Sequence, residues 1–137
     1  MSTKNQIKDK LQKTKQEMYD ECLKYYSNLV RCTQNVVIDQ ALKSAHKGRN
    51  KVSFDVYANT NNMEVYGGID DTYEYSNPDD KKECSQTPKF SCHNMIDSDT
   101  KKINEIINAK AKSLYDIDVN ASTSYYKNGG LYYGCKW

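Results

Sequence analysis

Apolar residues recur at helical spacing along the first 48 residues of the chain. They follow one another at steps of three, four or seven residues, on Ile7, Leu11, Met18, Cys22, Tyr25, Leu29, Cys32 and Val36, and the stripe continues through Val37, Ala41, Leu42 and Ala45. Such spacing places them along one face of a helix. Thr3 and Gln6 have the spacing of a capping box, and Gly48 is a typical C-terminal stop. The pattern therefore predicts a long N-terminal helix within residues 1–48.

That helix would be too long for the domain that follows it. Forty-odd residues make a helix of about 60 Å, which exceeds the width of a domain of this size. We therefore expect one of two outcomes. Either the helix breaks, near Asn28 or between Thr33 and Asn35, or its N-terminal part projects and meets another chain.

From Lys51 the apolar period changes from helical to alternating. Val52, Phe54 and Val56 alternate with polar residues, as in a strand with one covered face. A turn at residues 59–62 and a return strand from Met63 to Tyr66 complete a first strand pair within residues 49–69. Residues 70–98 are the least regular part, an acidic insert that holds both prolines and two cysteines.

Residues 99–137 repeat the order of helix and strands. Asp97, Ser98 or Asp99 is expected to cap a helix whose apolar face comprises Ile103, Ile106, Ile107, Ala111 and Leu114. Alternation resumes at residues 117–121, and residues 127–130 (KNGG) predict a hairpin turn. The last strand would then place Leu131, Tyr133, Cys135 and an anchored Trp137 on one face.

A short stretch occurs twice, as residues 54–60 (FDVYANT) and 117–123 (IDVNAST), each followed by a Gly-Gly pair. Together these patterns predict a single α+β domain. Two helix-strand-strand units would form one mainly antiparallel sheet, with both helices on one face and an approximate twofold between the units. One alternative is a circularly permuted ferredoxin-like strand order. Another is that the two seven-residue stretches, the heptads, are similar by chance.

Charge divides the chain into three parts. Residues 1–50 carry ten basic and five acidic side chains, residues 51–97 four and nine, and residues 98–137 six and four. The first ten residues contain no apolar run, so we expect a protein that is not secreted by the usual route, without a membrane span, and with its five cysteines as thiols. The sequon at Asn120 would then be a chance match.

Candidate chemistry is sparse, and we expect neither an enzyme nor a cofactor. Cys84, Cys92 and His93 lie in one segment, but their spacing suits zinc poorly, and a Cys84–Cys92 disulfide and free thiols remain open beside it. Asp55 and Asp118 occupy equivalent positions in the two heptads. They could form a carboxylate pair, although strand alternation favours solvent-facing positions.

The features that remain point to binding through surfaces. The long helix is the expected interaction element, through self-association or a protein partner, with the residues Lys8, Leu11, Lys15, Met18, Tyr25 and Leu29. The alternative is a nucleic-acid-binding module that uses the basic N-terminal helix, because lysines there could contact phosphates. Acidic residues interleave with those lysines, which weakens the alternative.

Four segments follow one another along the chain: Ala45-His46-Lys47-Gly48, the strand from Val52 to Val56, the helix from Ile103 to Leu114, and Leu131 to Trp137. In this pattern the chain resembles small, Lys/Asn/Tyr-rich proteins of large nucleo-cytoplasmic DNA viruses. Ser113-Leu114-Tyr115 stands where a glycine would be typical. The resemblance implies a viral structural or accessory protein, located in the host cytoplasm or in the virion, and it carries over no activity and no site.

Overall fold

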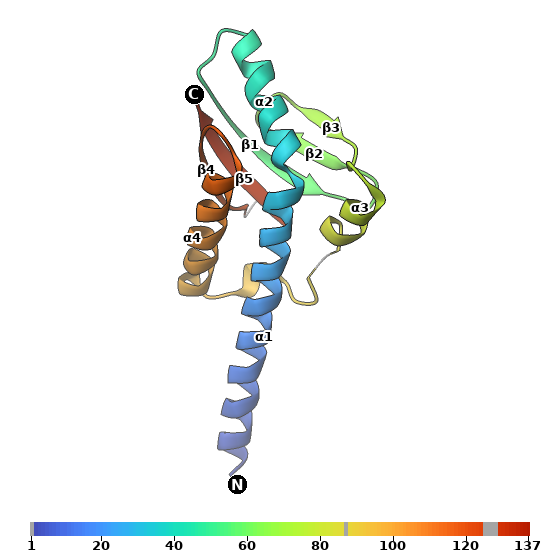
Figure 1. Ribbon diagram of the computed structural model, residues 1–137. Coiled ribbons are helices and arrows are strands. Elements are labelled where there is room, and N and C mark those ends of the chain that lie inside the picture. Colours follow the sequence, from blue (N-terminus) through green and yellow to red (C-terminus); the bar gives the residue numbers. More distant parts are fainter. Residues whose placement is uncertain (1, 87, 125–128) are drawn as a thin grey trace.

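The computed structural model describes residues 2–86, 88–124 and 129–137, and it has an α+β fold (Figure 1). The helices are α1 (Thr3–Cys32), α2 (Gln34–His46), α3 (Pro78–Cys84) and α4 (Asp97–Leu114), with a 3-10 turn, η1 (Cys92–Asn94). The strands are β1 (Lys51–Ala58), β2 (Met63–Tyr66), β3 (Asp71–Tyr73), β4 (Asp118–Ser124) and β5 (Gly130–Lys136). They form one antiparallel sheet in the order β3-β2-β1-β5-β4.

Helices α1, α2 and α4 lie on one face of the sheet, as the sequence predicts (Figure 1). Strand alternation places every second side chain beneath them, and the residues of β1 and β5 that are buried on this face are Val52, Phe54, Val56, Leu131, Tyr133 and Cys135. We call the opposite face, which carries the intervening residues of these strands, the open face. The core thus lies between one helical layer and one face of the sheet.

The N-terminal helix is interrupted at a single residue, Thr33. Its hydroxyl donates a hydrogen bond to the Leu29 carbonyl one turn earlier, at 2.8 Å, and lies 2.6 Å from the Tyr133 hydroxyl. Back-bonding of this kind bends helices. Tyr115 joins the group by donating to the Val30 carbonyl at 2.6 Å. The predicted break is confirmed, and the N-terminal part of α1 also projects beyond the rest of the molecule (Figure 1).

The helix starts differ from the predicted caps. Ser2, not Thr3, is the N-cap of α1, and its hydroxyl accepts from the Asn5 backbone N–H at 3.3 Å. In α4 the residue before the first turn is Ile96, which has no side chain able to cap. Asp97 and Asp99 lie within the first turn, where negative charge is favourable at the positive end of the helix dipole.

The segment of residues 70–98 is more ordered than the sequence predicts. It contains β3, α3 and η1, and Asn77 caps α3 by accepting from the Asp80 backbone N–H at 2.8 Å. The Arg31 guanidinium bonds both Asp80 and Glu83, at 3.0 and 2.8 Å, which ties α3 to α1. The acidic residues of this segment thus serve partly as ion-pair partners for α1.

The end of the chain is less buried than predicted. The Trp137 side chain is 43% exposed, and its backbone N–H donates to the Asn50 carbonyl at 3.2 Å. Strand β5 ends at Lys136, so alternation no longer directs the Trp137 side chain into the core. Of the predicted KNGG turn, residues 127 and 128 lie outside the described residues, whereas Gly129 has a φ of +80°.

The two helix-strand-strand units are not related by a twofold. The equivalent strands are β1 and β4, which come first in each unit, and β2 and β5, which come second. A twofold axis would place equivalent strands symmetrically about the middle of the sheet. In the observed order β2-β1-β5-β4, the second strand precedes the first in both units, so the two pairs are repeated side by side. The glycine pairs also differ, because Gly67 and Gly68 follow β2 while Gly129 and Gly130 lie at the start of β5. A duplication therefore remains a prediction.

Helix α4 covers the free edge of the sheet at β4. Asn104 Oδ1 accepts from the Thr123 N–H at 2.8 Å, and Asn108 Oδ1 accepts from the Ala121 N–H at 3.0 Å. These N–H groups point away from β5 and would otherwise have no strand to bind. One helical turn between the two asparagines matches the two-residue step along the strand.

Candidate protein-interaction site

The most distinctive surface is the projecting segment, which we define as residues 3–13 of α1. Every residue in it is exposed. It can stay helical without packing against the core, because it extends a helix that the packed turns after it have already nucleated. Over about 16 Å it presents four lysines and one aspartate: Lys4, Lys8, Lys10, Lys13 and Asp9.

The apolar stripe of α1 continues from the core into this segment. Cys22 and Leu29 are fully buried, and the same helical face carries Leu11 and Ile7 further toward the N-terminus. There the two side chains are 53% and 63% exposed. They line a shallow apolar hollow together with Gln6, Lys10 and Thr14. The helix face that packs in the core at Cys22 and Leu29 is therefore not covered by any described residue at Ile7 and Leu11.

The structure separates the six residues predicted for interaction into two groups. Lys8, Leu11 and Lys15 are exposed on or next to the projecting segment. Met18 is half-buried against the core, and the Tyr25 hydroxyl donates to the Gly129 carbonyl at 2.8 Å. Leu29 is fully buried in the chain's own core, so its side chain is not available to a partner.

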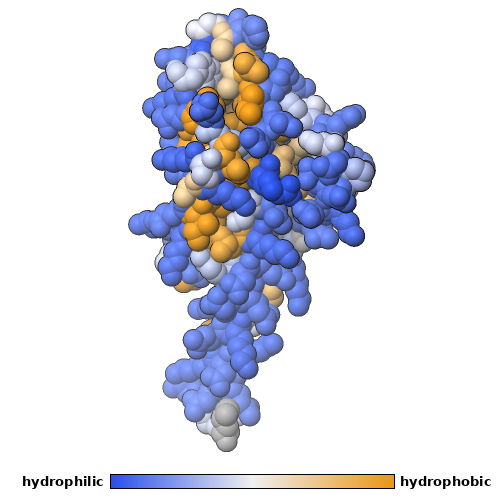
Figure 2. All heavy atoms as spheres, in the orientation of Figure 1, coloured by the Kyte–Doolittle hydropathy of each residue, from blue (hydrophilic) through white to orange (hydrophobic). Residues whose placement is uncertain are grey.

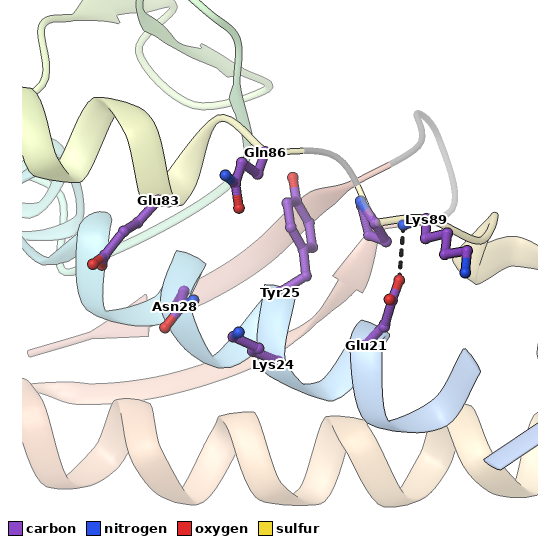
Figure 3. A pocket seen from close by; sticks show the side chains of 8 residues that line it. Glu21, Lys24, Tyr25, Asn28, Glu83, Gln86 and Lys89 are labelled. Atoms are coloured by element: carbon purple, nitrogen blue, oxygen red, sulfur yellow. Dashed lines mark hydrogen bonds between the residues drawn. The ribbon is translucent and has the colours of Figure 1, made fainter. Parts of the chain in front are cut away.

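The C-terminal half of α1 borders a polar crevice of about 320 Å³ (Figure 3). Its lining comes from α1, α3 and the segment after α3: Glu21, Lys24, Tyr25, Asn28, Glu83, Gln86, Pro88 and Lys89. The Glu21 carboxylate accepts from the Lys89 backbone N–H at 2.9 Å and so closes one end. Ammonium and carboxylate groups both line this space, and none of its described side chains is a thiol or an imidazole.

Two disulfides join α1 to the segment behind that crevice. Cys22 is bonded to Cys92 and Cys32 to Cys84, with Cα atoms 5.9 and 6.5 Å apart. The expectations of free thiols and of a Cys84–Cys92 disulfide are therefore wrong. The reason is that α1 runs beside the segment and brings each of its cysteines against a different partner.

The same pairing engages the two cysteines that were considered for zinc. Cys84 and Cys92 are engaged in disulfides, and His93 is exposed on η1. Among the described residues, Cys32, Asp80 and Cys84 gather closely enough to hold an ion, but their two sulfurs are bonded to each other. The remaining thiol, Cys135, is buried, and burial raises its pKa to about 12, so it is protonated at neutral pH.

The spacing of the cysteines along the sequence does carry a signal for these pairings. Cys22 and Cys32 are ten residues apart, and Cys84 and Cys92 are eight apart. Two pairs with similar spacing can align when a helix lies beside a second segment, which is what α1 and the α3–η1 segment do.

The carboxylate pair considered for Asp55 and Asp118 is not formed. Asp55 lies opposite Tyr132 and Asp118 opposite Lys136, on different sides of β5. Four residues along β5 separate the two positions, which corresponds to about 13 Å. Both carboxylates belong to the open face, as the strand alternation favours.

No family model, curated protein or solved structure matches the chain significantly. None of the described helices is long and apolar enough to cross a membrane.

Proposed function

We propose that this protein is a non-enzymatic interaction protein that binds a protein partner through the projecting segment. The observation that supports this is the apolar stripe of α1, which leaves the core and continues to the exposed Ile7 and Leu11. An exposed stripe in register with a buried one is suited to pack against a further chain.

The energies indicate what such a partner must supply. Complete burial of a leucine or isoleucine side chain contributes about 1.5–3 kcal/mol. Since Ile7 and Leu11 are little more than half exposed, covering both contributes about 2–4 kcal/mol, too little for a stable complex. The lysines must therefore contribute as well, and a partner needs carboxylates near an apolar groove.

A second copy of the same segment is a poor partner. An antiparallel pair that placed Ile7 opposite Leu11 of the other copy would bring Lys8 opposite Lys10 of that copy, and Asp9 opposite Asp9. Like charges at such positions are destabilising. We therefore propose a different protein, with an apolar groove bordered by acidic side chains.

We also propose that this protein is a viral component, on the basis of its resemblance to viral structural and accessory proteins. Within that setting, the two disulfides favour a virion over the host cytoplasm, because cytosolic thiols are kept reduced.

The test compares two matched variants of the full chain. Ile7→Asn/Leu11→Asn alters the projecting segment, and Ile38→Asn/Leu42→Asn alters an exposed i,i+4 pair on α2, where apolar side chains gather at the surface (Figure 2). A partner captured from the natural source should be lost with the first variant and retained with the second. The purified partner should bind directly, and more weakly at high salt.

Three outcomes would overturn the proposal. Capture that is equal for both variants would exclude the segment as the site. A dimer seen by light scattering and dissociated by Ile7→Asn/Leu11→Asn would make a second copy the partner. Salt-sensitive binding of nucleic acid that survives this variant but is lost with Lys4→Gln/Lys8→Gln would support the nucleic-acid alternative.

A further inference from the structure

The two repeated heptads place an aspartate in different surroundings on the open face. Asp118 lies directly opposite Lys136 on β5, so a cation is available across the strand pair. Asp55 lies between Tyr66 of β2 and Tyr132 of β5. Directly opposed residues have Cβ atoms about 5 Å apart, so both tyrosines are cross-strand neighbours of Asp55.

Asp55 has no hydrogen-bond or ion-pair partner among the residues that the structure describes. Several carboxylates elsewhere in the molecule do form ion pairs: Asp39 and Asp71 with Lys43, and Asp80 with Arg31. The described lysines of the open face, Lys51 and Lys136, lie about four residues along the strands from the Asp55 row, at roughly 13 Å. Within residues 2–86, 88–124 and 129–137, this partly exposed carboxylate between two tyrosines therefore has no cation as a partner.

The Tyr132 ring adds a flat apolar surface beside that carboxylate. A Cβ added to Gly134 would lie 3.9 Å from a Tyr132 ring carbon and 4.0 Å from its hydroxyl oxygen, so the ring leans over this glycine. Tyr132 remains 40% exposed in that position. A ring that leans over the sheet next to a carboxylate offers two contacts at once, a π face and an anion.

We propose that Asp55 and Tyr132 form a binding site for an arginine side chain of a protein partner. A guanidinium group is planar, so it can stack on the Tyr132 ring while it donates two parallel hydrogen bonds to the Asp55 carboxylate. Lysine fits less well, because its ammonium is a compact charge that does not stack. The occupant is not the projecting segment of a second copy, since residues 3–13 contain no arginine.

The site is tested on the full, disulfide-intact protein with two probes, the capped tripeptides Gly-Arg-Gly and Gly-Lys-Gly. Titration followed by NMR should give saturable shifts at residues of the Asp55 and Tyr132 rows with the arginine peptide, and weaker ones with the lysine peptide. Asp55→Asn should weaken arginine binding at least about tenfold. Tyr132→Leu should reduce the preference for arginine over lysine.

The matched control is Asp118→Asn, which removes the equivalent charge from the same face. Binding that falls equally in Asp55→Asn and Asp118→Asn would show a general charge effect and overturn the proposal, as would the absence of saturation in the unaltered protein. Equal affinity for the two peptides would also overturn it. Since the site is remote in sequence from the projecting segment, Ile7→Asn/Leu11→Asn should leave arginine binding unchanged.

Discussion

Removing the disulfides should lower the free energy of unfolding, and the loss with one or both bridges removed should depend on the fact that one bridge encloses the other. Cys22–Cys92 spans 70 residues and encloses Cys32–Cys84, which spans 52. In the chain-entropy description, either bridge alone restricts the unfolded chain by about 4 kcal/mol. Once one bridge is closed, the other closes a ring of only about 18 residues, worth about 3 kcal/mol.

Cys22→Ala/Cys92→Ala and Cys32→Ala/Cys84→Ala should therefore each lower the free energy of unfolding by about 3 kcal/mol. The variant that lacks both bridges should lose about 7 kcal/mol, which is more than the two separate losses combined, because only then is a long loop freed.

The assay is guanidinium unfolding followed by circular dichroism, in oxidising buffer and with a thiol reductant. The reductant should bring the unaltered protein to the stability of the variant without bridges, and it should leave that variant unchanged. The dependence on denaturant should steepen as bridges are removed, because the unfolded chain becomes more exposed.

Two results would refute this reasoning. One is a loss below about 1 kcal/mol for both single-bridge variants, with the bridges verified by mass spectrometry in the unaltered protein. The other is a loss in the variant without bridges that does not exceed the loss from removing a single bridge.

Two further predictions concern the sheet and its buried hydroxyls. Gly130→Ala should destabilise by about 1–3 kcal/mol in thermal unfolding, because its Cβ would lie 2.1 Å from the Tyr57 ring, whereas Gly134→Ala, whose Cβ would approach no atom closer than 3.9 Å, should cost far less; equal losses would contradict this. Burial raises the pKa of Tyr115 and Tyr133 above the usual value near 10. Above that pH the unfolded state loses these protons first, so stability to urea should fall by about 1.4 kcal/mol per pH unit for each tyrosine until its raised pKa is reached. Tyr133→Phe should make that fall less steep, and an unchanged slope would contradict the assignment.

The elements with strong periodicity could be predicted from the sequence. The alternation of Val52, Phe54 and Val56 fixed β1 and its buried face, and the stripe from Ile103 to Leu114 located α4. These features follow from local burial, which a single sequence displays directly.

The features that depend on contacts between distant segments could not be predicted in the same way. The strand order places β5 between β1 and β4, and neither hairpin determines that neighbour. The cysteine pairing depends on how the α3–η1 segment lies against α1. The exact site of the helix break was also open, because it depends on the hydroxyl of Tyr133, a hundred residues from Thr33 in the chain.

The asparagines that face β4 bear on how this protein behaves at high concentration. An unpaired strand edge is a template on which further chains can add, and this is one route to aggregation. Asn104 and Asn108 occupy the N–H groups that such an incoming strand would need. At the other end of the sheet β3 is only three residues long. Crowding should therefore leave these sheets discrete, and contacts between neighbouring molecules would have to form through their side-chain surfaces.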